Sequence, residues 1–154
     1  MDAELLLLFR DMGMGLMLGL SACGSGAGAG VAGMAAIGAW KKKYSQNKPA
    51  SFMLLAFVGA PLTQTIYGMI VMNRMADQAL ASHGAFLIGI GAFCGLAIGL
   101  SAYYQGKCAA CACDAMEETG KGFGNYMIIL GFTETVALLV MAFTLGILGR
   151  LAGA

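Results

Sequence analysis

The sequence predicts an all-α integral membrane protein whose four transmembrane helices form two tandem duplicated hairpins. Hydrophobic residues make up 59% of the chain and charged residues only 11%, whereas about 25% of a soluble domain is charged. The few charges leave four long apolar windows, residues 12–40, 49–73, 84–106 and 122–149. Each window exceeds the roughly 20 helical residues that cross a hydrocarbon core. The four spans leave no room for a soluble catalytic domain.

The first window, residues 12–40, is built for close helix contact. It contains pairs of small residues four positions apart, Gly15–Gly19, Gly24–Gly28 and Gly26–Gly30. Such pairs let helix backbones approach closely in lipid. Because they occupy more than one face, the helix suits the tightly curved inner wall of an assembly. Packing inside a four-helix monomer is an equally good explanation of the glycines alone.

The second window, residues 49–73, carries a polar face. Ala60, Thr63, Gln64 and Tyr67 follow helical spacing and therefore share one side of the helix. Pro61 lacks an N–H group, so we expect it to free nearby backbone carbonyls.

The third window, residues 84–106, repeats the small-residue pattern at Gly91, Gly95 and Gly99 and ends near Gln105. Cys108, Cys111 and Cys113 follow it and are predicted to be small packing residues towards the end of the helix. No histidine lies beside them, which argues against a zinc site.

The fourth window, residues 122–149, contains one charge, Glu134, near its middle. An ionised acid at the bilayer centre costs about 3 kcal/mol or more, so a proton, a cation or a partner's charge must neutralise it. An intramembrane carboxylate is therefore a candidate functional site, and the function that it predicts is ion transport. Thr63, Gln64, Gln105 and a freed carbonyl would add neutral oxygens, a set that suits a monovalent cation better than a divalent one.

The hairpins are related by internal repetition. Superposing Gln64 on Glu134 aligns two Thr-X-Thr cores, residues 63–65 and 133–135, and superposing Gly33 on Gly106 pairs Gly26 with Gly99. We expect one membrane domain, residues 1–154, with repeats at 12–78 and 84–152. Only the second repeat keeps the carboxylate.

Basic residues predict the orientation. Most of them lie in the first connection or flank the third, namely Lys41, Lys42, Lys43, Lys48, Lys107 and Lys121, and the remaining three are Arg10, Arg74 and Arg150. The positive-inside rule then puts the first and third connections in the cytoplasm and both termini outside.

Taken in order, these features resemble the proteolipid (c or K) subunit of V-type and bacterial A/V-type rotary ATPases over nearly the whole chain. The resemblance rests on the duplicated hairpin, the glycine-rich first helix, the run Pro61-Leu62-Thr63-Gln64 with Tyr67, the run Gln105-Gly106-Lys107 and the run Thr133-Glu134-Thr135. It implies a non-catalytic subunit of a homo-oligomeric rotor ring, turned by ATP hydrolysis on partner subunits.

The resemblance also implies a site and partners. Na⁺, or less favourably H⁺, would be carried on Glu134. The Ala60 carbonyl, Thr63, Gln64 and Gln105 would be the other ligands, and Tyr67 would hydrogen-bond the glutamate. A stator subunit would supply an arginine, and a central-stalk subunit would meet the cytoplasmic loops. The implied setting is a bacterial or archaeal plasma membrane, with surrounding lipid, no cofactor and no nucleic acid.

One departure and two alternatives accompany this interpretation. Leu62 and Thr65 stand where related sequences often have glycine, so we expect a more crowded site. A small secondary cation or proton-coupled transporter could also use an intramembrane carboxylate, although such folds usually contain inverted repeats. A membrane thiol oxidoreductase could use Cys108 and Cys111.

Overall fold

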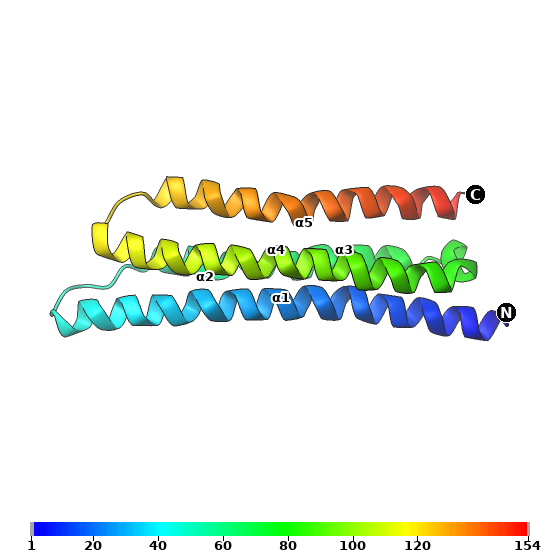
Figure 1. Ribbon diagram of the computed structural model, residues 1–154, viewed down its shortest axis with the longest axis horizontal. Helices are drawn as coiled ribbons and strands as arrows, with labels where there is room; N and C mark the ends of the chain where they lie inside the picture. Colours follow the sequence, from blue (N-terminus) through cyan, green and yellow to red (C-terminus); the bar gives the residue numbers. More distant parts are fainter. Residues whose placement is uncertain (1, 154) are drawn as a thin grey trace.

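The computed structural model describes residues 2–153 and is an antiparallel bundle of long helices (Figure 1). The elements are α1 (Ala3–Ser45), α2 (Leu54–Gly59), the short 3₁₀ helix η1 (Ala60–Leu62), α3 (Thr63–Met75), a second 3₁₀ helix η2 (Gln78–His83), α4 (Gly84–Thr119) and α5 (Phe123–Ala152). Four helical segments are long and apolar enough to cross a membrane, Ala3–Ser45, Leu54–Met75, Gln78–Thr119 and Phe123–Ala152. The predicted all-helical class is confirmed, and both chain ends lie at one end of the bundle. Residues 1 and 154 of the expected domain lie outside the described residues.

Several helices run beyond their apolar windows, because charged side chains at a membrane border can extend a helix into water. We expected Lys107 to flank the third connection, but it lies inside α4, where its ammonium sits 5.6 Å from the ring centroids of both Tyr103 and Tyr104. The connection is the short segment after Thr119. It contains Gly120 and Gly122 with φ of 67° and 90°, a backbone region that favours glycine.

The glycines of α1 divide into two groups. A methyl group added to Gly24 would overlap the backbone of Gly99, and one added to Gly28 would overlap Ala102 of the same helix, α4. These positions allow α1 and α4 to touch along their lengths. A second group has open space within 4 Å of the added methyl group, namely Gly15, Gly19, Gly26 and Gly30. Within the single chain, the close contact with α4 is therefore made by the face of α1 that carries Gly24 and Gly28.

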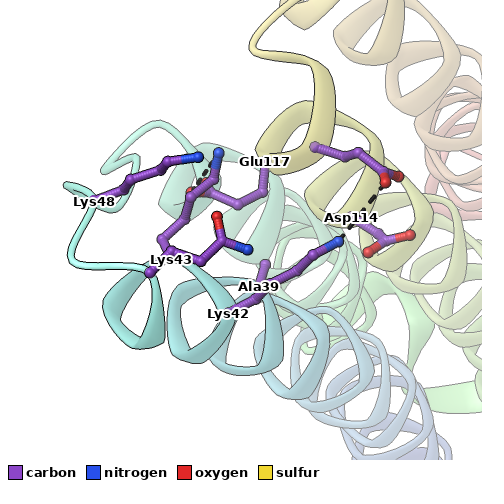
Figure 2. Close-up of a pocket in the computed structure, with 8 residues that line it drawn as sticks. Ala39, Lys42, Lys43, Lys48, Asp114 and Glu117 are labelled. Carbon is purple, nitrogen blue, oxygen red and sulfur yellow. Dashed lines mark ion pairs between the residues drawn. The ribbon is translucent and has the colours of Figure 1, made fainter.

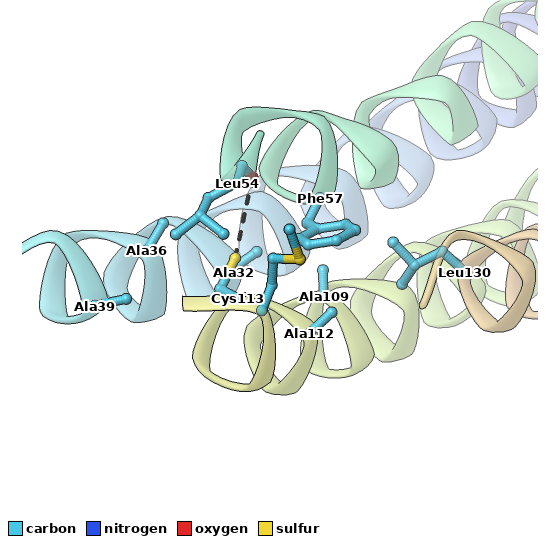
Figure 3. Close-up of a cluster of buried hydrophobic side chains, with 10 residues drawn as sticks. Ala32, Ala36, Ala39, Leu54, Phe57, Ala109, Ala112, Cys113 and Leu130 are labelled. Carbon is cyan, nitrogen blue, oxygen red and sulfur yellow. Dashed lines mark hydrogen bonds between the residues drawn. The ribbon is translucent and has the colours of Figure 1, made fainter. Parts of the chain in front are cut away.

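Two apolar clusters enclose a polar layer. The cluster nearer the first connection joins all four spans and is centred on Phe57, with Ala32, Ala109 and Leu130 around it (Figure 3). The other cluster includes Met17, Val71, Ile98, Ala137 and Leu148. Gln64, Gln105 and Glu134 fall between the two clusters along their helices. The packing thus places the polar groups near the middle of the bundle.

Lys42 and Lys43, which we expected in the first connection, lie in the last turn of α1 and meet acids of α4. Lys42 lies 3.7 Å from Glu118 and Lys43 lies 4.0 Å from the buried Glu117, at the rim of a cavity of about 230 Å³ (Figure 2). These ion pairs join the ends of the two hairpins. Trp40 adds a link within the first hairpin by donating its indole N–H to the Ser51 carbonyl at 2.8 Å.

Candidate ion-binding site

Pro61 changes the course of the second span beside Glu134. Residues Ala60–Leu62 form a turn of 3₁₀ helix, because Pro61 has no N–H to continue the α-helical ladder. We expected the turn to leave carbonyls free. Instead, the Ala60 carbonyl accepts the backbone N–H of Thr63 and also the Thr63 hydroxyl at 3.0 Å. The turn brings Ala60, Thr63 and Gln64 to the level of the carboxylate.

Glu134 on α5 is half-buried and accepts hydrogen bonds from α3 and α4. Its Oε1 lies 2.8 Å from the Thr63 hydroxyl and 2.6 Å from the Tyr67 hydroxyl. Its Oε2 lies 3.3 Å from Gln105 Nε2. Within residues 2–153, no lysine, arginine or histidine pairs with this carboxylate. Its charge is stabilised only by neutral donors.

The two glutamines are fully buried and bonded to each other. Gln64 Nε2 donates to Gln105 Oε1 at 2.7 Å, and Gln105 Nε2 donates to the Leu130 carbonyl at 2.9 Å. Gln105 therefore turns its nitrogen towards Glu134, whereas we expected its oxygen to face the ion. Its carbonyl oxygen keeps a second lone pair.

The Thr63 hydroxyl has more acceptors around it than it has protons. It lies 3.0 Å from the Ala60 carbonyl, 3.1 Å from Gln64 Oε1 and 2.8 Å from Glu134 Oε1. A hydroxyl donates one hydrogen, so it can satisfy only one of these three oxygens fully. Four oxygens from four residues thus converge around this hydroxyl, and two further donors reach them, the Thr63 backbone N–H at the Ala60 carbonyl and the Tyr67 hydroxyl at Glu134 Oε1. An added positive charge, whether a metal cation or a proton, would relieve their mutual repulsion.

The sequence model of a family described as the C subunit of ATP synthase matches residues 12–73 and 88–147, one stretch in each hairpin. The chain belongs to this ATP synthase C-subunit family. Its members are non-catalytic and form rings that translocate ions in rotary ATPases. No curated protein matches the chain. Membership confirms the prediction of a non-enzymatic rotor subunit and leaves the thiol oxidoreductase and secondary transporter hypotheses without support.

Sequence reasoning missed two polar contacts of this C-subunit site. The Ser101 hydroxyl donates to the Thr133 carbonyl at 2.6 Å, and the Leu130 carbonyl accepts from Gln105. Ser101 precedes Gln105 by one helical turn, so the spacing alone could have indicated that both face α5. Together they attach α4 to the backbone on the N-terminal side of Glu134.

Leu62, which we expected to crowd the site, has a side chain that is 52% exposed. Thr65 is half-buried and makes none of the hydrogen bonds of the site.

The cysteines of α4 take no part in the site. Cys108 and Cys111 border an apolar cavity with Tyr126 and Ile129, and Cys113 is buried in the core. No group of three His, Cys, Asp or Glu residues in the described range could hold a metal ion.

Proposed function

We propose that this chain is the rotor-ring subunit of a V-type ATPase and that it carries Na⁺ on Glu134. The observation that supports this proposal is the convergence of the Ala60, Thr63, Gln64 and Glu134 oxygens around one hydroxyl proton. A proton on Glu134 would relieve one of these oxygen contacts, whereas a cation among the oxygens would relieve all of them.

In this proposal Na⁺ has five ligands, the Ala60 carbonyl, Thr63, Gln64, Gln105 and Glu134. Gln105 uses the lone pair of its oxygen that Gln64 leaves open. Tyr67 stays outside the ligand set and holds the carboxylate in place through its 2.6 Å hydrogen bond. One carboxylate and four neutral oxygens match a single positive charge.

Rotation then exchanges the ion. With Na⁺ bound, Glu134 is effectively neutral and can pass through lipid. Close to the stator, an arginine of that partner replaces the ion, which leaves through an aqueous half-channel. Carrying one charge against 100 mV costs about 2.3 kcal/mol.

Gln64 occupies the position in the first repeat that Glu134 occupies in the second, so each chain has one carrier for its four spans. Fewer ions then cross per turn, and more of the free energy of ATP is available for each ion. We therefore propose a pump that works against a steep gradient, with ATP hydrolysed on partner subunits.

The assembly and its orientation are part of the same proposal. Repeats 12–78 and 84–152 make one subunit, whose free α1 glycine face, Gly15, Gly19, Gly26 and Gly30, packs against the next subunit. The end of α1 that carries Lys41–Lys43 and the connection that follows it face the cytoplasm and the central stalk, and both termini lie outside a bacterial or archaeal plasma membrane.

Carbodiimide labelling of the purified ring tests the transported ion. The reagent attacks a protonated carboxyl, so Glu134 should be labelled at mildly acidic pH. Na⁺ should protect it by displacing the proton, whereas K⁺, which is too large for five oxygens at this spacing, should not. Thr63→Ala should weaken the protection much more than the labelling itself, because it removes a ligand and leaves the acid.

Thr65→Ala is the matched control, since Thr65 takes no part in the hydrogen bonds of the site, and it should retain wild-type protection. Labelling that is indifferent to Na⁺ from millimolar to molar concentrations at fixed pH would instead identify H⁺ as the transported ion.

A further inference from the structure

Ser25 is a buried polar residue of α1 that the proposed ion site does not yet explain. Its side chain is 1% exposed, and its hydroxyl has no hydrogen-bond partner among the described residues. Ser21, one turn earlier and equally buried, donates to the Met17 carbonyl at 2.7 Å. A buried polar group without a hydrogen-bond partner is unfavourable, so we expect a specific partner for the Ser25 hydroxyl nearby.

The register of α1 against the second span puts Ser25 beside Gln64. A methyl group added to Gly68 would overlap the Ser21 hydroxyl, and one added to Gly28 would lie 3.1 Å from Pro61 Cβ. The two helices therefore run antiparallel. Ser25 follows Ser21 by one turn, and Gln64 precedes Gly68 by one turn. Both lie at the same height, with Ser25 on the α1 side of the glutamine.

One of the two amide N–H groups of Gln64 has no hydrogen-bond acceptor among the residues that the structure describes. Its amide carries two N–H donors, and the structure gives Nε2 one acceptor, Gln105 Oε1 at 2.7 Å. The amide oxygen faces the Thr63 hydroxyl at 3.1 Å. The second N–H and the Ser25 hydroxyl are thus two buried groups on facing helices, each able to satisfy the other.

We infer that Ser25 is a positioning residue for the ion site and that it acts through Gln64. After rotation about its Cα–Cβ bond, its hydroxyl oxygen would accept the second amide N–H of Gln64, and its own proton would go to the Ser21 carbonyl, as that of Ser21 goes to Met17. This contact holds the amide with its oxygen towards Thr63 and the ion. The inference rests on the proposed sodium site.

Loss of the contact should affect Na⁺ and H⁺ differently. Without Ser25 the Gln64 amide can rotate and present its NH₂ group to the site, which repels a cation. Protonation of Glu134 needs no oxygen from Gln64. Sodium affinity should therefore fall while the pH midpoint of carbodiimide labelling, measured without sodium, stays unchanged.

The test compares Ser25→Ala with Ser21→Ala in the intact ring. We expect Ser25→Ala to raise the Na⁺ concentration for half-protection about five-fold, the equivalent of one hydrogen bond of about 1 kcal/mol. Ser21→Ala should leave it unchanged, and the thermal stability of both rings should match the wild type. Ser25→Cys, which is slightly larger and forms weaker hydrogen bonds, should fall between wild type and Ser25→Ala.

Three results would overturn the inference. The two serine variants could behave alike, Ser25→Ala could shift the proton midpoint together with sodium, or Ser25→Cys could be worse than Ser25→Ala, which would mean that size matters and hydrogen bonding does not. If wild-type labelling ignores Na⁺, the proposed sodium site itself fails, and this inference with it.

Discussion

At the scale of single residues, the carboxylate of Glu134 is held by hydroxyl and amide donors and by no basic side chain in the described range. A permanent ion pair would bind the charge to one partner and oppose release. Neutral donors orient the group and, in the proposed function, leave its neutralisation to the transported ion. Gln64 and Gln105 add rigidity, because both are fully buried and bonded to each other.

Glu134→Gln should preserve the assembled ring and abolish coupled transport. The amide keeps the size of the side chain and removes an ionisable group that is costly in the bilayer, so detergent-purified rings should be as stable as wild type. ATP-driven Na⁺ uptake into vesicles should fall to background. Uptake at the wild-type rate would contradict the assignment of Glu134 as the carrier.

Gln64→Glu should weaken sodium binding without creating a second transported ion. Two carboxylates within one site cannot both stay ionised at low cost, because like charges repel strongly there. Equilibrium binding of ²²Na⁺ to the purified ring should still saturate at one ion per chain, with lower affinity. Saturation at two ions would show that Gln64 belongs to a separate site.

At the scale of elements, one irregular turn and one unusually close helix contact decide how the helices are placed around the candidate site. The 3₁₀ turn at Ala60–Leu62 points Thr63 and Gln64 at α5 and α4. The glycines between α1 and α4 let these helices touch backbone to backbone. The turn depends on proline and the close contact depends on glycine. Substitutions at these positions should therefore affect the site by moving the helix backbones.

Gly24→Ala and Gly26→Leu should separate folding of the chain from assembly of the ring. A methyl group at Gly24 overlaps Gly99 backbone, so the first variant should destabilise the bundle itself. Gly26 has open space within the chain, so a leucine should leave the helical fold intact and block the next subunit. Circular dichroism and SDS-resistant ring formation measure the two effects. A Gly26→Leu ring of normal yield would exclude that face as the contact.

Asp77 should stabilise the connection between α3 and η2 in a pH-dependent way. The backbone N–H of Ala79 bonds its carboxylate and lowers its pKa from 3.8, and the adjacent Arg74 guanidinium lowers it further. A lowered pKa contributes stability above the ordinary value that is lost as the pH falls through the folded value. Asp77→Ala should therefore reduce thermal stability at pH 7, and this deficit should shrink as the pH falls below 3.8 towards the lowered pKa of the folded state. A deficit that stays the same as the pH falls from 7 through this range would contradict this role.

At the scale of the whole molecule, the chain has two ends of different character. One end carries the ion pairs between Lys42, Lys43 and the acids of α4, and the other carries both chain ends (Figure 1). The large apolar surfaces left exposed on the single chain include Phe93, Phe132 and Phe143. In a membrane ring such surfaces meet lipid or a neighbouring copy.

The ring should carry one labelled carboxyl per chain at full carbodiimide modification. Mass spectrometry of the dissociated subunit should show a single adduct, located at Glu134 by fragmentation, because it is the only acid inside residues 122–149. The acids of α4 near the lysines lie at the end of the bundle and should react no faster with added Na⁺ than without it. Sodium-sensitive labelling at Glu117 would contradict a single carrier.

The sequence by itself determined the four spans, the central carboxylate and the polar face of the second span. These follow from the free-energy cost of a charge in lipid and from the helical period. Both can be assessed from the positions of residues along the chain alone. The same reasoning placed Thr63, Gln64, Tyr67, Gln105 and Glu134 within reach of one another.

Only the tertiary structure decided which polar atom meets which. Gln105 turns its nitrogen to Glu134, the Ala60 carbonyl is engaged by Thr63, and Ser101 bonds the Thr133 carbonyl. Likewise, Gly24 faces α4 while Gly26 faces outward. Such choices depend on the rotation and depth of each helix relative to its neighbours, because several donors and acceptors of equal strength compete at one level. Packing of the whole bundle decides which of them pair, and residue spacing along the chain does not predict these pairs.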